Sequence, residues 1–299
     1  MLALGDGIAY FSEPLNALAP GPLISLTPAH QFQYIGPENE RRFLKPFEGL
    51  TALKYPWMNE VAAIRTVRDV RRVLRRARLF PRMSTRSRPL LKDPFAFFAI
   101  PWFIERLACT PVVAVRHPAA VASSMKRLGW RFDFNHLLGQ PLLMDDLLAP
   151  HRHEIEKLSR TPADSVAHAG VLWKIIYGTL PRFTDEFDEI LVVRHEDLSS
   201  SPVEGFERLS RSLGLRFDAE TAERVRGFTD DRNPTELDQA EPHSIRVNSH
   251  ANLSNWQRRL TKEEIQLVRE TTEEVAELYY PGFAADSSVL APDPERSPR

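Results

Sequence analysis

The fold is decided by the stretch from Arg88 to Trp130, RPLLKDPFAFFAIPWFIERLACTPVVAVRHPAAVASSMKRLGW. Residues 88–92 are short and apolar, residues 95–107 are rich in aromatic side chains, and residues 111–115 are apolar and β-branched. An uninterrupted apolar run of the last kind is typical of a buried strand in a parallel sheet. The stretch therefore predicts strand, helix, strand and helix in succession.

An arginine follows the second of these strands. Arg116 and His117 precede Pro118, a residue that suits the first turn of a helix. The apolar residues of that helix recur at helical spacing: Val121, Met125 and Leu128. In open α/β sheets, anions bind where the C-terminal end of a strand meets a helix N-terminus. Arg116 is therefore the first candidate for an anion ligand, because a guanidinium binds phosphate through two hydrogen bonds.

These residues carry a family resemblance. An Arg-x-Pro turn after an apolar strand, with Ser124 eight residues beyond the arginine, resembles the 3′-phosphate-binding segment of sulfotransferases that use 3′-phosphoadenosine 5′-phosphosulfate (PAPS). Other segments resemble the family in its order: SEPLN at Ser12–Asn16, LKDP at Leu91–Pro94, VVRHEDLSSSP at Val192–Pro202 and SNWQRRLTKEE at Ser254–Glu264. Together they extend over nearly all of the chain up to about Tyr280.

The resemblance implies an α/β fold of the P-loop NTPase-like, three-layer kind with a central parallel sheet. The strands that would form this sheet are residues 8–11, 90–92, 112–115 and 190–193. We expect one domain over residues 1–283 and a disordered tail over residues 284–299, because the tail lacks core-forming side chains. The implied reaction is in-line transfer of a sulfuryl group from PAPS to an acceptor hydroxyl.

The resemblance also implies catalytic roles for three residues. Lys92 would contact the sulfuryl group from the end of its strand. Cytosolic members of the family have a histidine two positions after this lysine as the general base, but here that position is Pro94. Glu13 is the preferred base, because carbohydrate-type members carry Glu-Pro-Leu in this context, and Asp93 is the reserve.

The nucleotide-binding residues that the resemblance implies are Arg116 and Ser124, which would bind the 3′-phosphate. His195 stands where the family has the tyrosine of Tyr-Glu-Asp, which lies near the nucleotide. Where cytosolic members have Arg-Lys-Gly, this chain has Ser-His-Ala, so that His250 would make a partial phosphate contact and Arg246 would compensate.

The element that holds the 5′-phosphosulfate in the family has no counterpart in this sequence. There is no Gly-Thr-Thr, no Pro-Lys-Ser-Gly and no Walker-type loop, whose backbone N–H groups would cradle the donor. We expect the native protein to begin upstream of Met1 and to supply a strand and such a loop. The alternative is a degenerate relative that binds a nucleotide without transferring sulfate.

Composition narrows the classes of function only slightly. The 299 residues include 39 basic and 40 acidic side chains, a net charge of −1 that gives no argument for nucleic acid. Cys109 is the single cysteine, which excludes an internal disulfide, and His151 and His153 lack acidic ligands at metal spacing, so we expect no metal. With no long apolar stretch, we expect a cytoplasmic protein.

Residues 59–78 predict an amphipathic helix with an apolar stripe and an arginine-rich face between Arg65 and Arg78. The stripe consists of Val61, Ile64, Val67, Val70, Leu74 and Ala77. The basic face could attract an anionic acceptor, the donor phosphates or an anionic membrane surface. It could equally be a solvated helix face, and the sequence leaves both interpretations open.

Other aromatic residues are predicted mainly from their surroundings. Trp102, Phe103 and Trp173 lie among apolar residues, and we expect them in the core. His30, Tyr34 and Trp57 are candidates for an acceptor pocket, although ordinary packing is the simpler interpretation. The acceptor itself is predicted as a small molecule or a carbohydrate or lipid hydroxyl.

One further enzyme class shares the predicted fold. A P-loop enzyme of phosphoryl transfer would need a Walker loop and an acidic, metal-binding strand end, and neither occurs in the sequence. The sulfotransferase interpretation is therefore preferred to this one.

Overall fold

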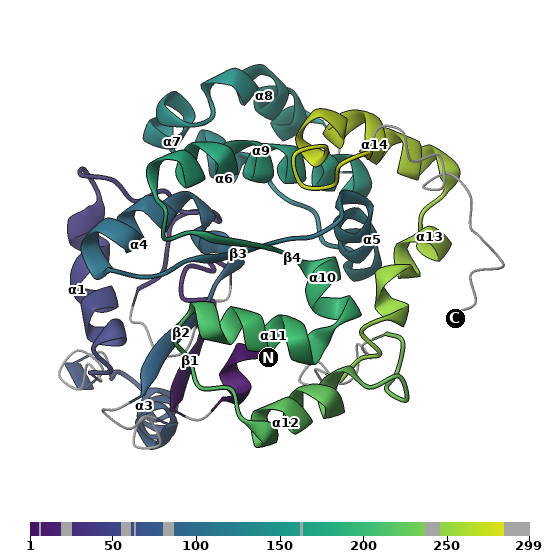
Figure 1. Ribbon diagram of the computed structural model, residues 1–299. Helices are drawn as coiled ribbons and strands as arrows, with labels where there is room; N and C mark the ends of the chain where they lie inside the picture. The colour runs from purple at the N-terminus through teal and green to yellow at the C-terminus, as the bar shows by residue number, and fades with distance from the viewer. Residues whose placement is uncertain are drawn as a thin grey trace. The chain divides into compact units, whose positions relative to one another are not determined.

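The computed structural model describes residues 1–5, 7–18, 26–54, 61–62, 64–79, 87–161, 164–236 and 246–283. Helices and short parallel strands alternate along this part of the chain (Figure 1). The chain divides into two compact units. The first unit contains residues 1–111 and 135–149, and the second contains residues 112–134 and 150–299.

The first unit contains a pair of parallel strands, β1 (Ile8–Ser12) and β2 (Arg88–Lys92). Ile8 lies opposite Arg88, and Ser12 lies opposite Lys92. The helices of this unit are η1 (Leu2–Leu4), α1 (Glu40–Thr51), α3 (Val67–Leu79), η3 (Pro94–Ala99), α4 (Ile100–Leu107), α6 (Asn135–Leu138) and α7 (Pro141–Asp146).

Aromatic side chains form much of the core of the first unit. Phe47 of α1 meets the ring of Phe103 at a centroid distance of 5.0 Å and that of Trp102 at 5.9 Å, both edge to face. This geometry favours ring pairs beyond the area that they bury. Trp102 and Phe103 are both buried, which confirms their predicted place in the core.

A buried amide joins two segments of the first unit that are distant in sequence. The side-chain oxygen of Gln140 accepts hydrogen bonds from Gln33 Nε2 (3.1 Å) and from the backbone N–H of Tyr34 (2.8 Å). Its nitrogen donates to the carbonyl oxygens of Phe32 (3.2 Å) and His136 (2.8 Å). All four hydrogen-bonding positions of this amide are therefore used, as a buried polar side chain requires.

The second unit contains the other pair of parallel strands, β3 (Val112–Val115) and β4 (Leu191–Arg194). Val112 lies opposite Leu191, and Val115 lies opposite Arg194. The helices are α5 (Pro118–Leu128), α8 (Arg152–Arg160), α9 (Ser165–Glu186), α10 (His195–Ser200), α11 (Pro202–Ser212), α12 (Ala219–Thr229), η5 (Ala251–Leu253), α13 (Asn255–Arg259) and α14 (Lys262–Ala276). The short η4 (Ala149–His151) spans the boundary between the units.

Helix α14 packs against α9 with close backbone approach. A Cβ atom at Gly178 would lie 3.3 Å from a methyl group of Val275, so a larger residue at this position of α9 would crowd α14. On α9, Trp173 is buried as predicted.

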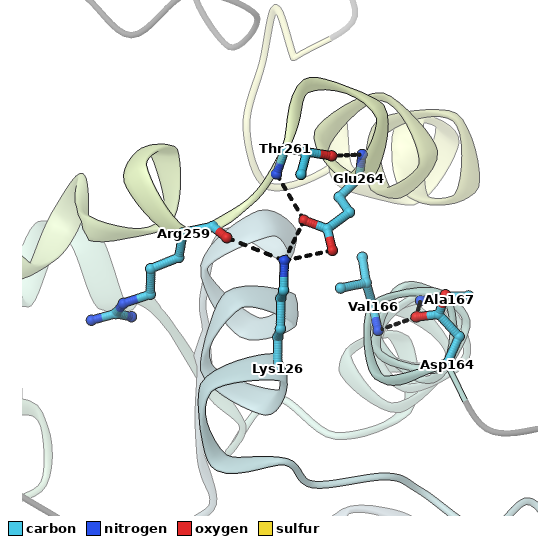
Figure 2. A network of polar contacts seen from close by, with 7 residues as sticks. All are labelled: Lys126, Asp164, Val166, Ala167, Arg259, Thr261 and Glu264. Atoms are coloured by element: carbon cyan, nitrogen blue, oxygen red, sulfur yellow. Dashed lines mark hydrogen bonds and ion pairs between the residues drawn. The ribbon is translucent and has the colours of Figure 1, made fainter.

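Helix α5 is joined to the beginning of α14 by a polar network (Figure 2). Lys126 Nζ lies 2.6 Å and 2.7 Å from the two carboxylate oxygens of Glu264 and donates to the carbonyl oxygen of Arg259. The same Glu264 carboxylate accepts the backbone N–H of Thr261, whose hydroxyl accepts the N–H of Glu264. Thr261 and Glu264 thus form the capping box that a Thr-x-x-Glu pattern before a helix predicts, and its carboxylate also pairs with Lys126.

The four predicted strands are confirmed, but they form two separate two-stranded sheets in the described part of the chain. The single central sheet of a P-loop-like fold stays a prediction. What the structure shows is a mixed α/β protein with small parallel sheets.

The predicted continuous helix over residues 59–78 is interrupted, because residues 61–62 are helical but residues 64–66 are not. Helix α3 begins at Val67, because the carboxylate of Asp69 accepts the backbone N–H groups of Arg65 (3.1 Å) and Thr66 (2.9 Å). Hydrogen bonds of this kind end the helix on its N-terminal side. Three residues of the predicted apolar stripe, Val67, Val70 and Leu74, are exposed.

Among the described residues, no helix combines the length and the apolar character needed to cross a bilayer. The predicted tail, residues 284–299, lies outside the described residues.

We predict that Thr261→Ala lowers the stability of the protein by about 1 kcal/mol, because the backbone N–H of Glu264 loses the hydroxyl that accepts its hydrogen bond. The midpoint of thermal unfolding should fall by about 2 °C. Thr271→Ala is the matched control on the same helix, since its hydroxyl donates to the Leu267 carbonyl within α14. Equal midpoints for the two variants would contradict the capping role.

Candidate functional site

The three predicted catalytic residues come together at the C-terminal ends of β1 and β2. Ser12 and Lys92 are the last paired residues, and the backbone N–H of Glu13 donates to the carbonyl oxygen of Lys92 (2.8 Å). Glu13 and Asp93 are therefore the residues that directly follow the two paired strands, at the same edge of the sheet. This first cluster, Glu13, Lys92 and Asp93, lies within the first unit.

Glu13 is held by polar partners on both carboxylate oxygens. Oε1 forms an ion pair with the Lys92 ammonium, and Oε2 accepts from Asn16 Nδ2 (2.8 Å). Burial raises the pKa of Glu13, but the hydrogen bonds from Lys92 and Asn16 and the charge of Lys92 outweigh burial, so the pKa lies below its ordinary value. Its backbone has φ of +49°, a left-handed conformation that is unfavourable for a residue with a side chain.

Asp93 has a different environment. Its carboxylate accepts the backbone N–H of Leu15 (2.5 Å) and that of Phe95 (2.9 Å), the latter as the N-cap of η3. Burial raises the pKa of Asp93 to about 6, although the two backbone hydrogen bonds oppose this rise. Asp93 thus fixes the turn that follows Glu13 through the N–H of Leu15, and its pKa of about 6 lies close to neutral pH.

In the second unit, Arg116 stands between β3 and α5 as predicted. Its carbonyl oxygen accepts the indole N–H of Trp173 (2.8 Å). The side chain is half-buried, and burial lowers the pKa of Arg116, as does the charge of Arg259, while the charge of Glu196 raises it. Within the described part of the chain, the guanidinium makes no hydrogen bond or ion pair, so its donors are available to an anion.

A carboxylate orders the turn that contains Arg116. Glu196 accepts the backbone N–H of His117 on Oε1 (2.9 Å) and the hydroxyl of Tyr280 on Oε2 (2.8 Å). The His117 ring stacks on Trp256 at a centroid distance of 4.9 Å and an interplanar angle of 14°. Burial and the charge of Glu196 raise the pKa of Tyr280, so its hydroxyl stays protonated and continues to donate.

His195 lies beside this turn. Burial lowers the pKa of its imidazole, and the positive charge of Arg116 lowers it further, while Glu196 opposes both. The ring is therefore neutral at neutral pH, with Nδ1 lying 3.4 Å from the Ser199 hydroxyl. The sequence places His195 at a nucleotide-facing position, and the structure brings it into the electrostatic environment of Arg116.

The remaining predicted nucleotide ligands are less closely grouped. Ser124 is half-buried on α5. Arg246 is exposed, with its guanidinium 5.6 Å from the ring centroid of Phe228, and His250 is exposed at the start of η5. In the residues that the structure covers, no hydrogen bond or ion pair links Arg246 or His250 to Arg116.

Sequence reasoning missed Glu196 and Arg259, the two residues whose charges act most strongly on the pKa of Arg116. Arg259 Nη1 donates to the buried hydroxyl of Ser123 (3.4 Å), and Nη2 pairs with Glu236 (2.7 Å). Glu196 and Asp197 form an acidic pair just beyond β4, and this pair could have indicated Glu196, because functional side chains often lie at the strand ends of parallel sheets. No local pattern singles out Arg259.

The residues proposed for an acceptor pocket are placed only in part. The His30 ring meets the His136 ring edge to face at 6.1 Å, and the Tyr34 hydroxyl donates to Asp146 (2.8 Å). Both contacts are ordinary packing within the first unit. Trp57 lies outside the described residues.

The protein is therefore a mixed α/β protein with ionic side chains at the C-terminal ends of its parallel strands. These are the first cluster in the first unit and Arg116 in the second. No family model matches the chain, and no curated protein matches it. Among solved structures, the chain is similar to the sulfotransferase domain from the curacin biosynthetic pathway, with a TM-score of 0.43 and 15% identity over 91% of this chain and 96% of that one. A likeness of this strength does not assign the chain to a family.

We predict a pH dependence of stability that comes from Asp93. Its folded pKa of about 6 lies above the unfolded value of about 3.9, so the folded state binds more protons between these values. The ionised carboxylate therefore destabilises the fold fully above pH 6, and the cost disappears as the pH falls toward 4. Relative to Asp93→Asn, the wild-type free energy of unfolding should rise by about 2 kcal/mol from pH 7 to pH 4.

Urea unfolding at a series of pH values measures this difference, and the contributions of other groups cancel between the two proteins. Asp188→Asn, at an exposed position in the second unit, is the control for the substitution itself. A difference between wild type and Asp93→Asn that stays constant from pH 4 to pH 7 would show that Asp93 titrates as in an unfolded chain.

Proposed function

We propose that the protein is a PAPS-dependent sulfotransferase that transfers a sulfuryl group to an acceptor hydroxyl. The observation that carries this proposal is Arg116: a half-buried guanidinium at the junction of β3 and α5, with its donors unused by the described residues. A cation in this position needs an anionic partner, and the end of a parallel strand before a helix is where phosphates bind. The resemblance of the surrounding sequence names that phosphate as the 3′-phosphate of the donor.

The proposed nucleotide-binding residues all belong to the second unit. Arg116 would bind the 3′-phosphate through two hydrogen bonds, and the Ser124 hydroxyl would donate a further one. Neutral His195 would hydrogen bond to the nucleotide without adding charge. Arg246 and His250 would add weaker phosphate contacts. Arg259 would add to the positive potential at the phosphate, since its charge already lowers the pKa of Arg116.

The transfer itself would be the task of the first cluster. Lys92 would donate to the sulfuryl oxygens, where negative charge develops in the transition state. Its ammonium is paired with Glu13 in the structure, so movement of Lys92 to the donor would remove the hydrogen bond and the charge of Lys92 that help to lower the pKa of Glu13. Glu13 would then become a stronger base for the acceptor proton just when the donor is bound.

The acceptor in this proposal is a carbohydrate or lipid hydroxyl, or that of another small molecule. Transfer from PAPS requires no metal, because Lys92 and the arginines supply the positive charge.

We predict that Arg116→Ala weakens binding of adenosine 3′,5′-bisphosphate by about 1.5 to 3 kcal/mol, the range of a hydrogen bond to a charged group. Isothermal titration calorimetry, with and without magnesium, measures this affinity. Arg224→Ala is the control, because Arg224 is exposed on α12 and pairs with Glu220. Unchanged affinity in the Arg116 variant would remove the observation on which the proposal rests.

The same titration distinguishes the two alternatives. Magnesium-dependent binding would favour a phosphoryl-transfer enzyme, in which the metal bridges the phosphates. Metal-independent binding without sulfate transfer would favour a nucleotide-binding relative that is not an enzyme.

We predict that Glu13→Gln leaves donor binding nearly unchanged and lowers turnover roughly a hundredfold or more, because the acceptor proton loses its base. A radiolabelled sulfate-transfer assay over a panel of hydroxyl acceptors gives the turnover. Asp93→Asn is the matched variant, which removes a carboxylate from the same cluster but retains an acceptor oxygen for the turn. Normal turnover in Glu13→Gln together with an inactive Asp93→Asn would assign the base to Asp93.

A further inference from the structure

Helix α3 has an unusual composition for a surface helix. Its sequence, VRDVRRVLRRARL, contains six arginines and one acidic residue, Asp69. The Asp69 carboxylate is occupied by the backbone N–H groups of Arg65 and Thr66 and by the Thr66 hydroxyl at the start of the helix. The Asp69 carboxylate thus serves the start of the helix, and the side chains of Arg68 and Arg71 are exposed.

The apolar residues of α3 are also largely exposed. Val67, Val70 and Leu74 expose 72%, 39% and 51% of their surfaces, respectively, whereas Val73 exposes only 4%. Spacings of three and four residues place Val67, Val70 and Leu74 on one face of the helix. Val73 lies toward the edge of that face, so α3 packs on the protein through one edge and presents the rest of its apolar face outward.

The two features occur on adjacent sectors of one helix. At 100° per residue, the sequence places its arginines in a continuous sector next to the exposed valines and leucine. An ordinary surface helix buries its apolar stripe against the core and exposes its charges. Helix α3 exposes Val67, Val70 and Leu74 together with the arginines Arg68 and Arg71. This is the arrangement of a helix that lies in the interface of a membrane.

We propose that α3 docks on the surface of an anionic lipid bilayer, with its axis parallel to the surface. Val67, Val70 and Leu74 would enter the boundary between headgroups and acyl chains, while the arginines would contact lipid phosphates. Each arginine near an anionic surface strengthens binding roughly fivefold, so several together produce useful binding even though the net charge of the chain is −1. The attraction is local, because charges more than about 10 Å away are screened.

A nucleic acid is the other polyanion that an arginine-rich helix could bind. Contacts to nucleic acid phosphates need only the arginines and leave the exposed valines and leucine without a partner. A bilayer satisfies the charge and the apolar face together, and the proposal therefore commits to lipid. The inference does not depend on the proposed sulfate transfer.

Flotation of the full chain with vesicles tests the proposal at physiological salt. We expect binding to vesicles of phosphatidylcholine with about one-third phosphatidylserine, and at least roughly tenfold weaker binding to phosphatidylcholine alone. Arg68→Gln with Arg71→Gln should weaken binding to the anionic vesicles roughly tenfold or more. Val70→Ser with Leu74→Ser should weaken it by a similar factor while leaving the charge unchanged.

Two matched controls keep the test specific. Arg224→Gln with Arg226→Gln removes the same charge from α12, and Leu267→Ser with Leu278→Ser removes exposed leucines from α14 and the turn that follows it. Both control proteins should bind anionic vesicles like the wild type, and circular dichroism should show all variants folded.

Three outcomes would overturn the proposal. The first is no binding of the wild type to anionic vesicles. The second is equal weakening by the α3 variants and the control variants. The third is tighter binding to a 20-base-pair DNA duplex that displaces the vesicles and depends on Arg68 and Arg71 but not on Val70 and Leu74.

Discussion

The position of the anion-binding turn in the second unit depends on the hydrogen bonds of one peptide group, that between Arg116 and His117. The carbonyl of Arg116 and the N–H of His117 belong to the same peptide plane, and side chains from two different helices bind its two ends. Trp173 of α9 donates to the oxygen, and Glu196 of α10 accepts from the nitrogen. Because both polar atoms of this plane are satisfied, the turn between β3 and α5 has a defined orientation, and the side chain of Arg116 begins from a fixed point.

Glu196 extends this control beyond the turn. Its second oxygen accepts the Tyr280 hydroxyl, so residues that follow α14 are joined to the beginning of α5 and α10. Loss of the carboxylate would leave a backbone donor at a helix N-terminus and a tyrosine hydroxyl without their partner, a costly arrangement where these groups are shielded from water. The arrangement of the anion-binding turn and the packing of the last residues of the unit are therefore coupled through one side chain.

The sequence was sufficient for what local patterns encode. The apolar run that ends in Arg116-His117-Pro118 predicts the strand, the turn and the helix, and Thr261 with Glu264 predicts the capping box. It did not reveal the bridging by Glu196, because the partners of that carboxylate lie 79 and 84 residues away in sequence. Periodicity likewise predicted which residues of α3 share a face, but not whether another element covers that face. The later start of α3 follows from a local hydrogen bond of Asp69 that the periodicity argument did not consider.

The first cluster shows how two paired strand ends give their carboxylates different properties. Glu13 is kept ionised by Lys92, while Asp93 is pushed toward protonation by burial. The backbone at Glu13 adds a further constraint, since its positive φ costs about 1 kcal/mol relative to glycine. Any selection of this protein for thermal stability alone would thus favour glycine or asparagine at position 13. A laboratory evolution scheme that rewards heat resistance would steadily erase the carboxylate that faces Lys92.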